Sequence, residues 1–174
     1  KIQVVKQADV VMLLYLLEHK FSKEVKKANY DYYEKRTLHD SSLSLSTHSI
    51  LASDIDEKDL AYKLFQEATK IDLGENMKTS DHGIHAASLG GLWQIVVNGF
   101  GGLRMVGGNL RINPKLPENW SRLSFSFMWK GNKLDIELTK EGIKIEVKDE
   151  MLEEIEILVY DKKYVLNQIL KIKF

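Results

Sequence analysis

Residues 123–147 read LSFSFMWKGNKLDIELTKEGIKIEV, and this stretch decides the fold class of the second half of the chain. In each of three runs, apolar residues stand at every second position, and these residues are Leu123, Phe125, Phe127, Leu134, Ile136, Leu138, Ile143, Ile145 and Val147. This alternation is typical of antiparallel strands that bury one face. Gly131-Asn132 and Glu141-Gly142 separate the runs, as hairpin turns should. We therefore expect an antiparallel β-sandwich over residues 103–174.

The half of the chain before Gly102 has helical apolar spacing instead. It predicts five helices, at about residues 4–15, 22–33, 43–53, 57–71 and 84–97. Ser22 and Asp56 are the expected caps of the second and fourth helices, and a loop is expected at 74–81. Trp93, Trp120 and Trp129 are expected in the core. The whole chain is thus predicted to be an α+β, two-domain protein, with helices in residues 1–102.

Composition excludes several classes of protein. The 174 residues hold 25 Lys+Arg and 25 Asp+Glu, so nothing favours a nucleic-acid partner. The chain has no Cys, which excludes disulfides and thiolate metal sites and is compatible with the cytoplasm. The longest apolar run, 10–17, is too short to cross a bilayer. Because Lys1 is preceded by neither an initiator Met nor a signal peptide, the sequence reads as part of a longer protein.

Two polar clusters in the first half have a sugar-binding interpretation. Lys6-Gln7 offers donors and an acceptor for sugar hydroxyls, although two solvated surface residues would look the same. Three tyrosines, Tyr30, Tyr32 and Tyr33, precede Glu34. Aromatic faces stack on sugar rings and carboxylates bind hydroxyl pairs, but tyrosines at a helix end also serve simply as packing residues.

Two further clusters favour an anion. His39-Asp40-Ser41-Ser42 contains the residue types of a catalytic triad, but no nucleophile elbow surrounds either serine. Tandem hydroxyls at a helix start can hold phosphate, and the alternative is helix capping. His82-Gly83-Ile84-His85 opens the last predicted helix and offers a second anion or sugar ligand. The spacing lacks a third metal ligand, so no metal site is expected.

Taken together, these clusters resemble glycoside hydrolase family 65 over about residues 4–140. The motifs that carry the resemblance are Lys6-Gln7-Ala8-Asp9-Val10, Tyr32-Tyr33-Glu34, Thr37-Leu38-His39-Asp40-Ser41-Ser42-Leu43-Ser44, Gly83-Ile84-His85 and Gly90-Gly91-Leu92-Trp93. The resemblance implies the C-terminal part of an (α/α)6 barrel in residues 1–102 and a β-sandwich domain in residues 103–174. One departure is Lys35, which stands where the family often has proline.

The resemblance also implies an activity. Family members include inverting phosphorylases of maltose, kojibiose, nigerose and trehalose, in which inorganic phosphate attacks an α-glucoside and releases β-glucose 1-phosphate. Phosphate is thus a co-substrate, and no cofactor is expected. By the same resemblance, Lys6 and Gln7 contact the transferred glucose, Glu34 binds the acceptor sugar, and Ser41, Ser42 and His85 bind phosphate. The general acid, a glutamate, lies upstream of this chain, so residues 1–174 alone should be inactive.

Two alternatives stay open beside this reading. One is a hydrolase of the same family, and the other is a non-catalytic module for carbohydrate binding or assembly. The expected partners are a disaccharide, phosphate and the rest of the barrel, with a homodimer left open. Neither nucleic acid nor a membrane is expected as a partner, and the expected location is the cytoplasm.

Overall fold

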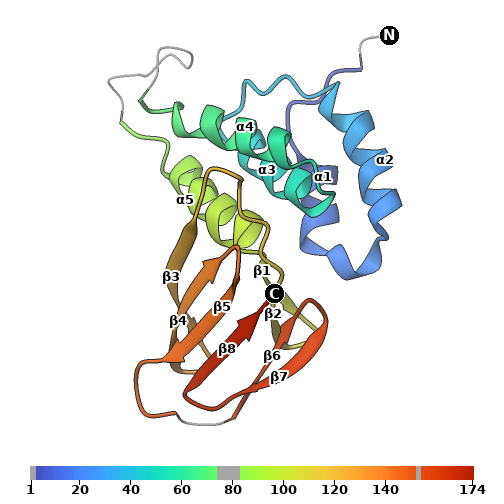
Figure 1. Ribbon diagram of the computed structural model, residues 1–174. Helices are drawn as coiled ribbons and strands as arrows, with labels where there is room; N and C mark the ends of the chain where they lie inside the picture. Colours follow the sequence, from blue (N-terminus) through green and yellow to red (C-terminus); the bar gives the residue numbers. More distant parts are fainter. Residues whose placement is uncertain (1–2, 74–82, 152–153) are drawn as a thin grey trace. The chain divides into compact units, whose positions relative to one another are not determined.

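The computed structural model describes residues 3–73, 83–151 and 154–174. The chain divides into two compact units, residues 1–99 and residues 100–174, and Figure 1 labels their elements. The first unit is helical and the second is built of strands, which confirms the change of apolar period along the sequence. The expected loop at 74–81 and the neighbouring His82 lie outside the described residues.

The described residues of the helical unit form five α-helices. They are α1 (Asp9–Leu16), α2 (Lys23–Glu34), α3 (Ser44–Asp54), α4 (Lys58–Thr69) and α5 (Ala86–Gln94), with a short 3-10 turn at Glu18–Lys20 and a π-helical turn at Ile95–Phe100 after α5. Ser22 caps α2 as predicted, because its hydroxyl accepts a hydrogen bond from the Val25 N–H at 3.4 Å.

Helix α3 is the centre of this unit and contacts α1, α2, α4 and α5. All ten of its residues from Ser44 to Ser53 are buried, although six of them are polar. The hydroxyls of Ser49 and Ser53 donate to the carbonyls of Ala61 and Gly99 at 2.8 and 3.2 Å. Burying a hydroxyl that has such a hydrogen-bond partner costs little free energy. The small size of these side chains also lets neighbouring helices come close. At Gly91 of α5, an added Cβ would lie 2.7 Å from the Ser46 hydroxyl.

Three details differ from the sequence-based expectation. Helix α1 begins at Asp9 rather than near Val4, because Val5 forms a bridge with Thr37. Asp56 does not cap α4; it adopts a left-handed φ of 66° and forms an ion pair with Lys23. The tryptophans are not core residues: Trp93 is 50% exposed, and the other two are half-buried.

The strands in the described part of the second unit form two four-stranded sheets. One has the order β1-β2-β6-β7, and the other has the order β3-β4-β5-β8. The strands are β1 (Leu103–Val106), β2 (Asn109–Ile112), β3 (Arg122–Trp129), β4 (Asn132–Thr139), β5 (Gly142–Val147), β6 (Ile155–Val159), β7 (Lys162–Leu166) and β8 (Ile169–Lys173). All neighbouring strands are antiparallel except β2 and β6, which run parallel.

The sheet register follows the alternation in the sequence. Ile136 lies opposite Phe125 on β3 and Ile145 on β5, and Leu138 lies opposite Leu123 and Ile143. The inward residues of β4 and β5 are almost fully buried, while Asp135 and Glu137 point to the other face. Lys130-Gly131 forms a tight turn with positive φ at both residues, as two-residue hairpins require. The antiparallel strands predicted for residues 123–147 are therefore confirmed.

Among the described helices, none combines the length and the apolar character that crossing a membrane would require.

Candidate functional site

The N-terminal segment is joined to the loop that follows α2. The Val5 N–H donates to the Arg36 carbonyl at 2.9 Å, and the Leu38 N–H donates to the Val5 carbonyl at 3.2 Å. This parallel pairing places Lys6 and Gln7, both exposed, directly beside the segment that contains Glu34. Gln7 lines a small hollow of about 110 Å³ together with Tyr33 at the end of α2 and Thr37 in the loop that follows. Two clusters that are far apart in the sequence thus belong to one region.

Glu34, at the end of α2, is held by two histidines from different elements. Its Oε1 accepts from His39 Nε2 at 3.3 Å, and its Oε2 accepts from His48 Nδ1 of the buried helix α3. His39 belongs to the loop between α2 and α3 and has a left-handed φ of 53°. The side chain of Glu34 is 22% exposed, and that of His48 is fully buried. The two histidines therefore hold the Glu34 carboxylate in place, while part of the carboxylate remains accessible to solvent.

The electrostatics of Glu34 follow from this environment. Partial burial alone would raise its pKa, but the hydrogen bonds from His39 and His48 outweigh burial and lower the pKa to about 2. Burial, and then the nearby Glu34 carboxylate, raise the pKa of the Tyr30 hydroxyl. Glu34 is thus an ionised acceptor at neutral pH. A carboxyl group with so low a pKa cannot serve as a general acid there.

The low pKa of Glu34 predicts how Glu34→Gln affects stability. Because about 2 lies below the ordinary value of 4.5, the interaction stabilises the folded chain above about pH 4.5 and is lost as the pH falls through 2. We expect Glu34→Gln to lower the free energy of unfolding by about 1–3 kcal/mol at pH 6. The difference should shrink toward pH 3, as urea unfolding would show. Glu67→Gln, at an exposed site on α4, is the control. A loss that is independent of pH would contradict the prediction.

The residues expected to bind phosphate lie at the starts of two helices. Ser41 and Ser42 are half-buried just before α3, and the Ser41 hydroxyl accepts from the Leu43 N–H at 3.4 Å. His85 is the residue before α5, and its Nδ1 contacts Asp72 Oδ1 at 2.6 Å. Gly91 of α5 lies against Ser46 of α3, and Gly99, in the π-helical turn after α5, lies against Ile50 of α3. Helix α3 and the segment formed by α5 and its π-helical turn therefore run in the same direction where they touch. Both starts therefore lie toward the same end of this helix pair. Convergence of the three side chains on one anion stays a prediction.

The structure separates other residues of the predicted clusters. His39 bonds to Ser44 Oγ at 3.1 Å and to Glu34, rather than to a triad built from Asp40 and Ser41. Among the three tyrosines only Tyr30 is buried. Sequence reasoning missed His48 altogether. The available signal was an imidazole in a helix whose other buried polar residues carry small hydroxyls, because a buried ionisable group requires a partner.

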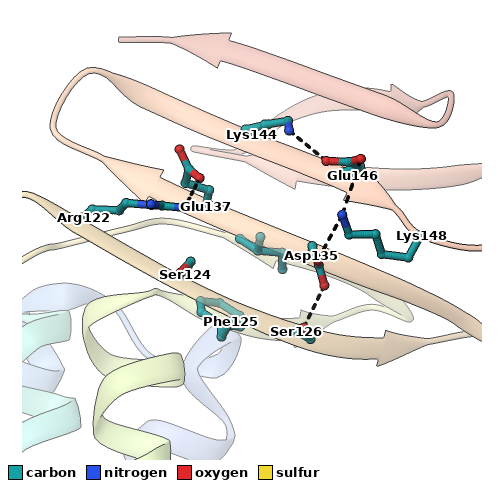
Figure 2. Close-up of a pocket in the computed structure, with 10 residues that line it drawn as sticks. Arg122, Ser124, Phe125, Ser126, Asp135, Glu137, Lys144, Glu146 and Lys148 are labelled. Carbon is teal, nitrogen blue, oxygen red and sulfur yellow. Dashed lines mark hydrogen bonds and ion pairs between the residues drawn. The ribbon is translucent and has the colours of Figure 1, made fainter.

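A second hollow, of about 390 Å³, lies on the polar face of β3, β4 and β5 (Figure 2). Its six charged residues pair with one another. Arg122 with Glu137 and Lys148 with Asp135 are pairs between strands, whereas Lys144 and Lys148 pair with Glu146 along β5 and its end. Three cations face three anions, so the net charge is zero. Because these described charges already satisfy one another, this face is a solvated ladder of ion pairs rather than a ligand site.

Comparison with known proteins identifies two family models along the chain. Residues 1–94 match the glycosyl hydrolase family 65 central catalytic domain, and residues 103–166 match the C-terminal domain of the same family. The first match alone covers more than half of the 174 residues. It includes Lys6, Gln7, Glu34, Ser41, Ser42 and His85.

Similar proteins include three curated enzymes. A kojibiose phosphorylase of Halothermothrix orenii is 48% identical over 95% of this chain and 22% of its own length. An alpha,alpha-trehalose phosphorylase of Thermoanaerobacter brockii is 45% identical over 95% of this chain and 21% of its own length. A 1,2-alpha-glucosylglycerol phosphorylase of Bacillus selenitireducens is 39% identical over 95% of this chain and 22% of its own length.

A solved structure of a proposed kojibiose phosphorylase from the human microbiome is 38% identical to this chain and has a TM-score of 0.91. The match covers 99% of this chain and 25% of that one. The chain thus spans about a fifth of the length of the three curated relatives.

Proposed function

The chain belongs to glycosyl hydrolase family 65, and on that premise we propose that it forms the C-terminal part of an inverting disaccharide phosphorylase. One observation carries the proposal: the three relatives described above, which match 95% of the chain at 39–48% identity, are phosphorylases of α-glucosides. In this proposal residues 1–102 complete an (α/α)6 barrel, residues 103–174 form a β-sandwich, and the enzyme works in the cytoplasm.

The residues divide the reaction between them. Lys6 and Gln7 bind the glucose that is transferred, and Glu34 binds the acceptor sugar as an ionised carboxylate. Ser41, Ser42 and His85 position phosphate on the face of the anomeric carbon that lies opposite the leaving oxygen. Inversion requires the nucleophile and the leaving group on opposite faces. The phosphate oxygen forms the new bond to this carbon as the glycosidic bond breaks. Phosphate is already an anion, so positioning replaces a protein base.

The leaving oxygen must receive a proton, and the low pKa of Glu34 argues against that residue as the donor. The donor in this proposal is a glutamate upstream of residues 1–174. The substrate is an α-glucoside of the kojibiose, trehalose, maltose or nigerose type. A hydrolase of the family would need a group that activates water. The tandem serines, which can serve an anion, support the phosphorylase instead.

A chimera tests the proposed function. It carries this chain in place of the corresponding C-terminal segment of the Halothermothrix orenii kojibiose phosphorylase, and it is assayed with the four disaccharides in the presence of phosphate. We expect the chimera to release β-glucose 1-phosphate from at least one of them. We expect residues 1–174 alone to release none, because no proton donor reaches the leaving oxygen.

Two controls complete this experiment. They are the unaltered relative and the same relative truncated before the exchanged segment. Glucose release without glucose 1-phosphate would support the hydrolase alternative. Glucose 1-phosphate formation by residues 1–174 alone would contradict the assignment of the proton donor to an upstream residue.

A further inference from the structure

The two histidines that contact Glu34 are fully engaged by hydrogen-bonding groups. His39 lies between Glu34 and the Ser44 hydroxyl, at 3.3 and 3.1 Å. His48 lies between Glu34 and the Thr37 hydroxyl, the latter at 3.5 Å. The four ring nitrogens thus each face one oxygen. This chain of contacts joins the end of α2, the loop after it and the buried helix α3.

Proton counting shows which way these contacts run. The Thr37 hydroxyl has one hydrogen and donates it to the Tyr33 carbonyl at 2.8 Å, so its oxygen accepts from His48 Nε2. His48 Nδ1 must donate to the carboxylate of Glu34, which is an acceptor only. The two contacts fix the orientation of the His48 ring, whose side chain has no exposed surface in α3.

We propose that His39 and His48 are positioning residues of the acceptor subsite, which hold the Glu34 carboxylate in place and ionised so that it accepts hydroxyl groups of the acceptor sugar. The inference rests on the proposed function, because that function assigns Glu34 to the acceptor. Neither histidine needs to touch the sugar: His48 has no exposed surface, and both act through Glu34.

The geometry suits this role. Each oxygen of Glu34 receives one histidine donor, which leaves further lone pairs on the exposed side for a pair of sugar hydroxyls. A carboxylate that is already fixed loses little conformational entropy when the sugar binds. Its charge also makes each hydrogen bond to a hydroxyl stronger than a neutral acceptor would.

Pairs of variants test the two histidines in the chimera. His48→Phe keeps a ring and removes the donor, whereas His48→Asn keeps a donor near the position of Nδ1. His39→Asn suits the left-handed backbone but does not reach Glu34, whereas His39→Gln keeps a donor near the position of Nε2. Initial rates are measured in the synthetic direction with glucose as the varied acceptor, and in phosphorolysis with phosphate as the varied substrate.

We expect His48→Phe and His39→Asn to raise the KM for the acceptor about tenfold or more, with the KM for phosphate within about twofold. His48→Asn and His39→Gln should restore most of the acceptor affinity. In His48→Phe, acceptor binding should also weaken as the pH falls below about 5, because Glu34 would regain a more ordinary pKa. Besides Glu34 and His48, the titratable groups that contact this cluster in the described part of the chain are Tyr30 and His39, and neither is a carboxyl group.

Glu34→Gln separates the two levels of the hypothesis. If it leaves the KM for the acceptor unchanged, the assignment of Glu34 to the acceptor is wrong. If it raises that KM while the histidine variants do not, the positioning inference is wrong. A purely structural role predicts a lower thermal midpoint and similar losses for acceptor and phosphate, which would also overturn the inference.

A bound metal is the remaining outcome of this test. Glu34, His39 and His48 offer three ligand atoms within 4.8 Å of one another. A metal would have to displace the ring protons that the carboxylate now accepts. We expect EDTA to leave the KM for the acceptor unchanged, and activity lost to EDTA and restored by Zn²⁺ alone would overturn the proposal.

Discussion

Replacing Ser41 and Ser42 together by alanine is expected to raise the KM for phosphate by about a hundredfold in the chimera. Both hydroxyls lie half-buried at the start of α3. The Ser41 hydroxyl accepts from the Leu43 N–H, so its hydrogen remains available to an anion. Each lost hydrogen bond to a charged ligand corresponds to roughly tenfold or more in affinity. The KM for the disaccharide should stay within about threefold, which is about 0.7 kcal/mol.

The same assay distinguishes phosphate binding from helix capping. Ser22 is a matched control, because it accepts from the Val25 N–H at 3.4 Å, the same distance as in the Ser41 contact. Ser22→Ala should lower stability by about 0.5–1 kcal/mol and leave the KM for phosphate unchanged. His85→Ala should behave like the single serine variants, whereas changes at Lys6 and Gln7 should weaken sugar binding in both directions. If the serine variants lose only stability, capping is the whole role of the two hydroxyls.

Gly102→Ala is expected to destabilise the strand unit by about 3 kcal/mol or more. Gly102 has a φ of +65°, and an added Cβ would lie 1.9 Å from the carbonyl oxygen of Asn113. That oxygen belongs to backbone that already pairs with Gly102, through the Asn113 N–H at 3.1 Å. Neither segment can withdraw without breaking this pairing just before β1. The measurement is the thermal midpoint of the chimera.

Gly107→Ala is the control for this substitution. Gly107 has a similar φ of +57°, but a Cβ there would meet nothing within 4 Å. It should therefore show only the cost of a left-handed residue, about 1–2 kcal/mol. Equal losses in the two variants would show that the contact with Asn113 contributes nothing.

The local parts of the fold could be predicted from the sequence, and the long-range parts could not. Ile136 and Ile145 alternate with charged residues, and this pattern alone predicts their strands and their buried face. The position of helix α3 was predicted correctly, but its complete burial was not. Its serines are buried because their hydroxyls donate to carbonyls far away in the sequence, as Ser49 does, and these hydrogen bonds cannot be read from the local pattern. The π-helical turn after Gln94 and the pairing of β2 with β6 depend on tertiary contacts that no local pattern records.

The candidate site also has a part that could be predicted from the sequence and a part that could not. The resemblance singled out Lys6 and Glu34, and the Val5–Thr37 bridge brings their segments together. The partner of Glu34 on α3 could not be predicted, because His48 is 14 residues away and a lone histidine in a buried helix is usually a core residue. Only the fold shows that this imidazole faces the carboxylate.

Because β2 pairs in parallel with β6, the first sheet cannot close until most of the chain has left the ribosome. The hairpins of β3, β4 and β5 pair with their neighbours in sequence and can form as they emerge. Until β6 arrives, β2 exposes an open edge with unpaired N–H and C=O groups beside Leu110 and Ile112, a template for another chain. A stop codon between β5 and β6 would therefore leave an aggregation-prone product. The C-terminal strands thus also protect the newly made protein.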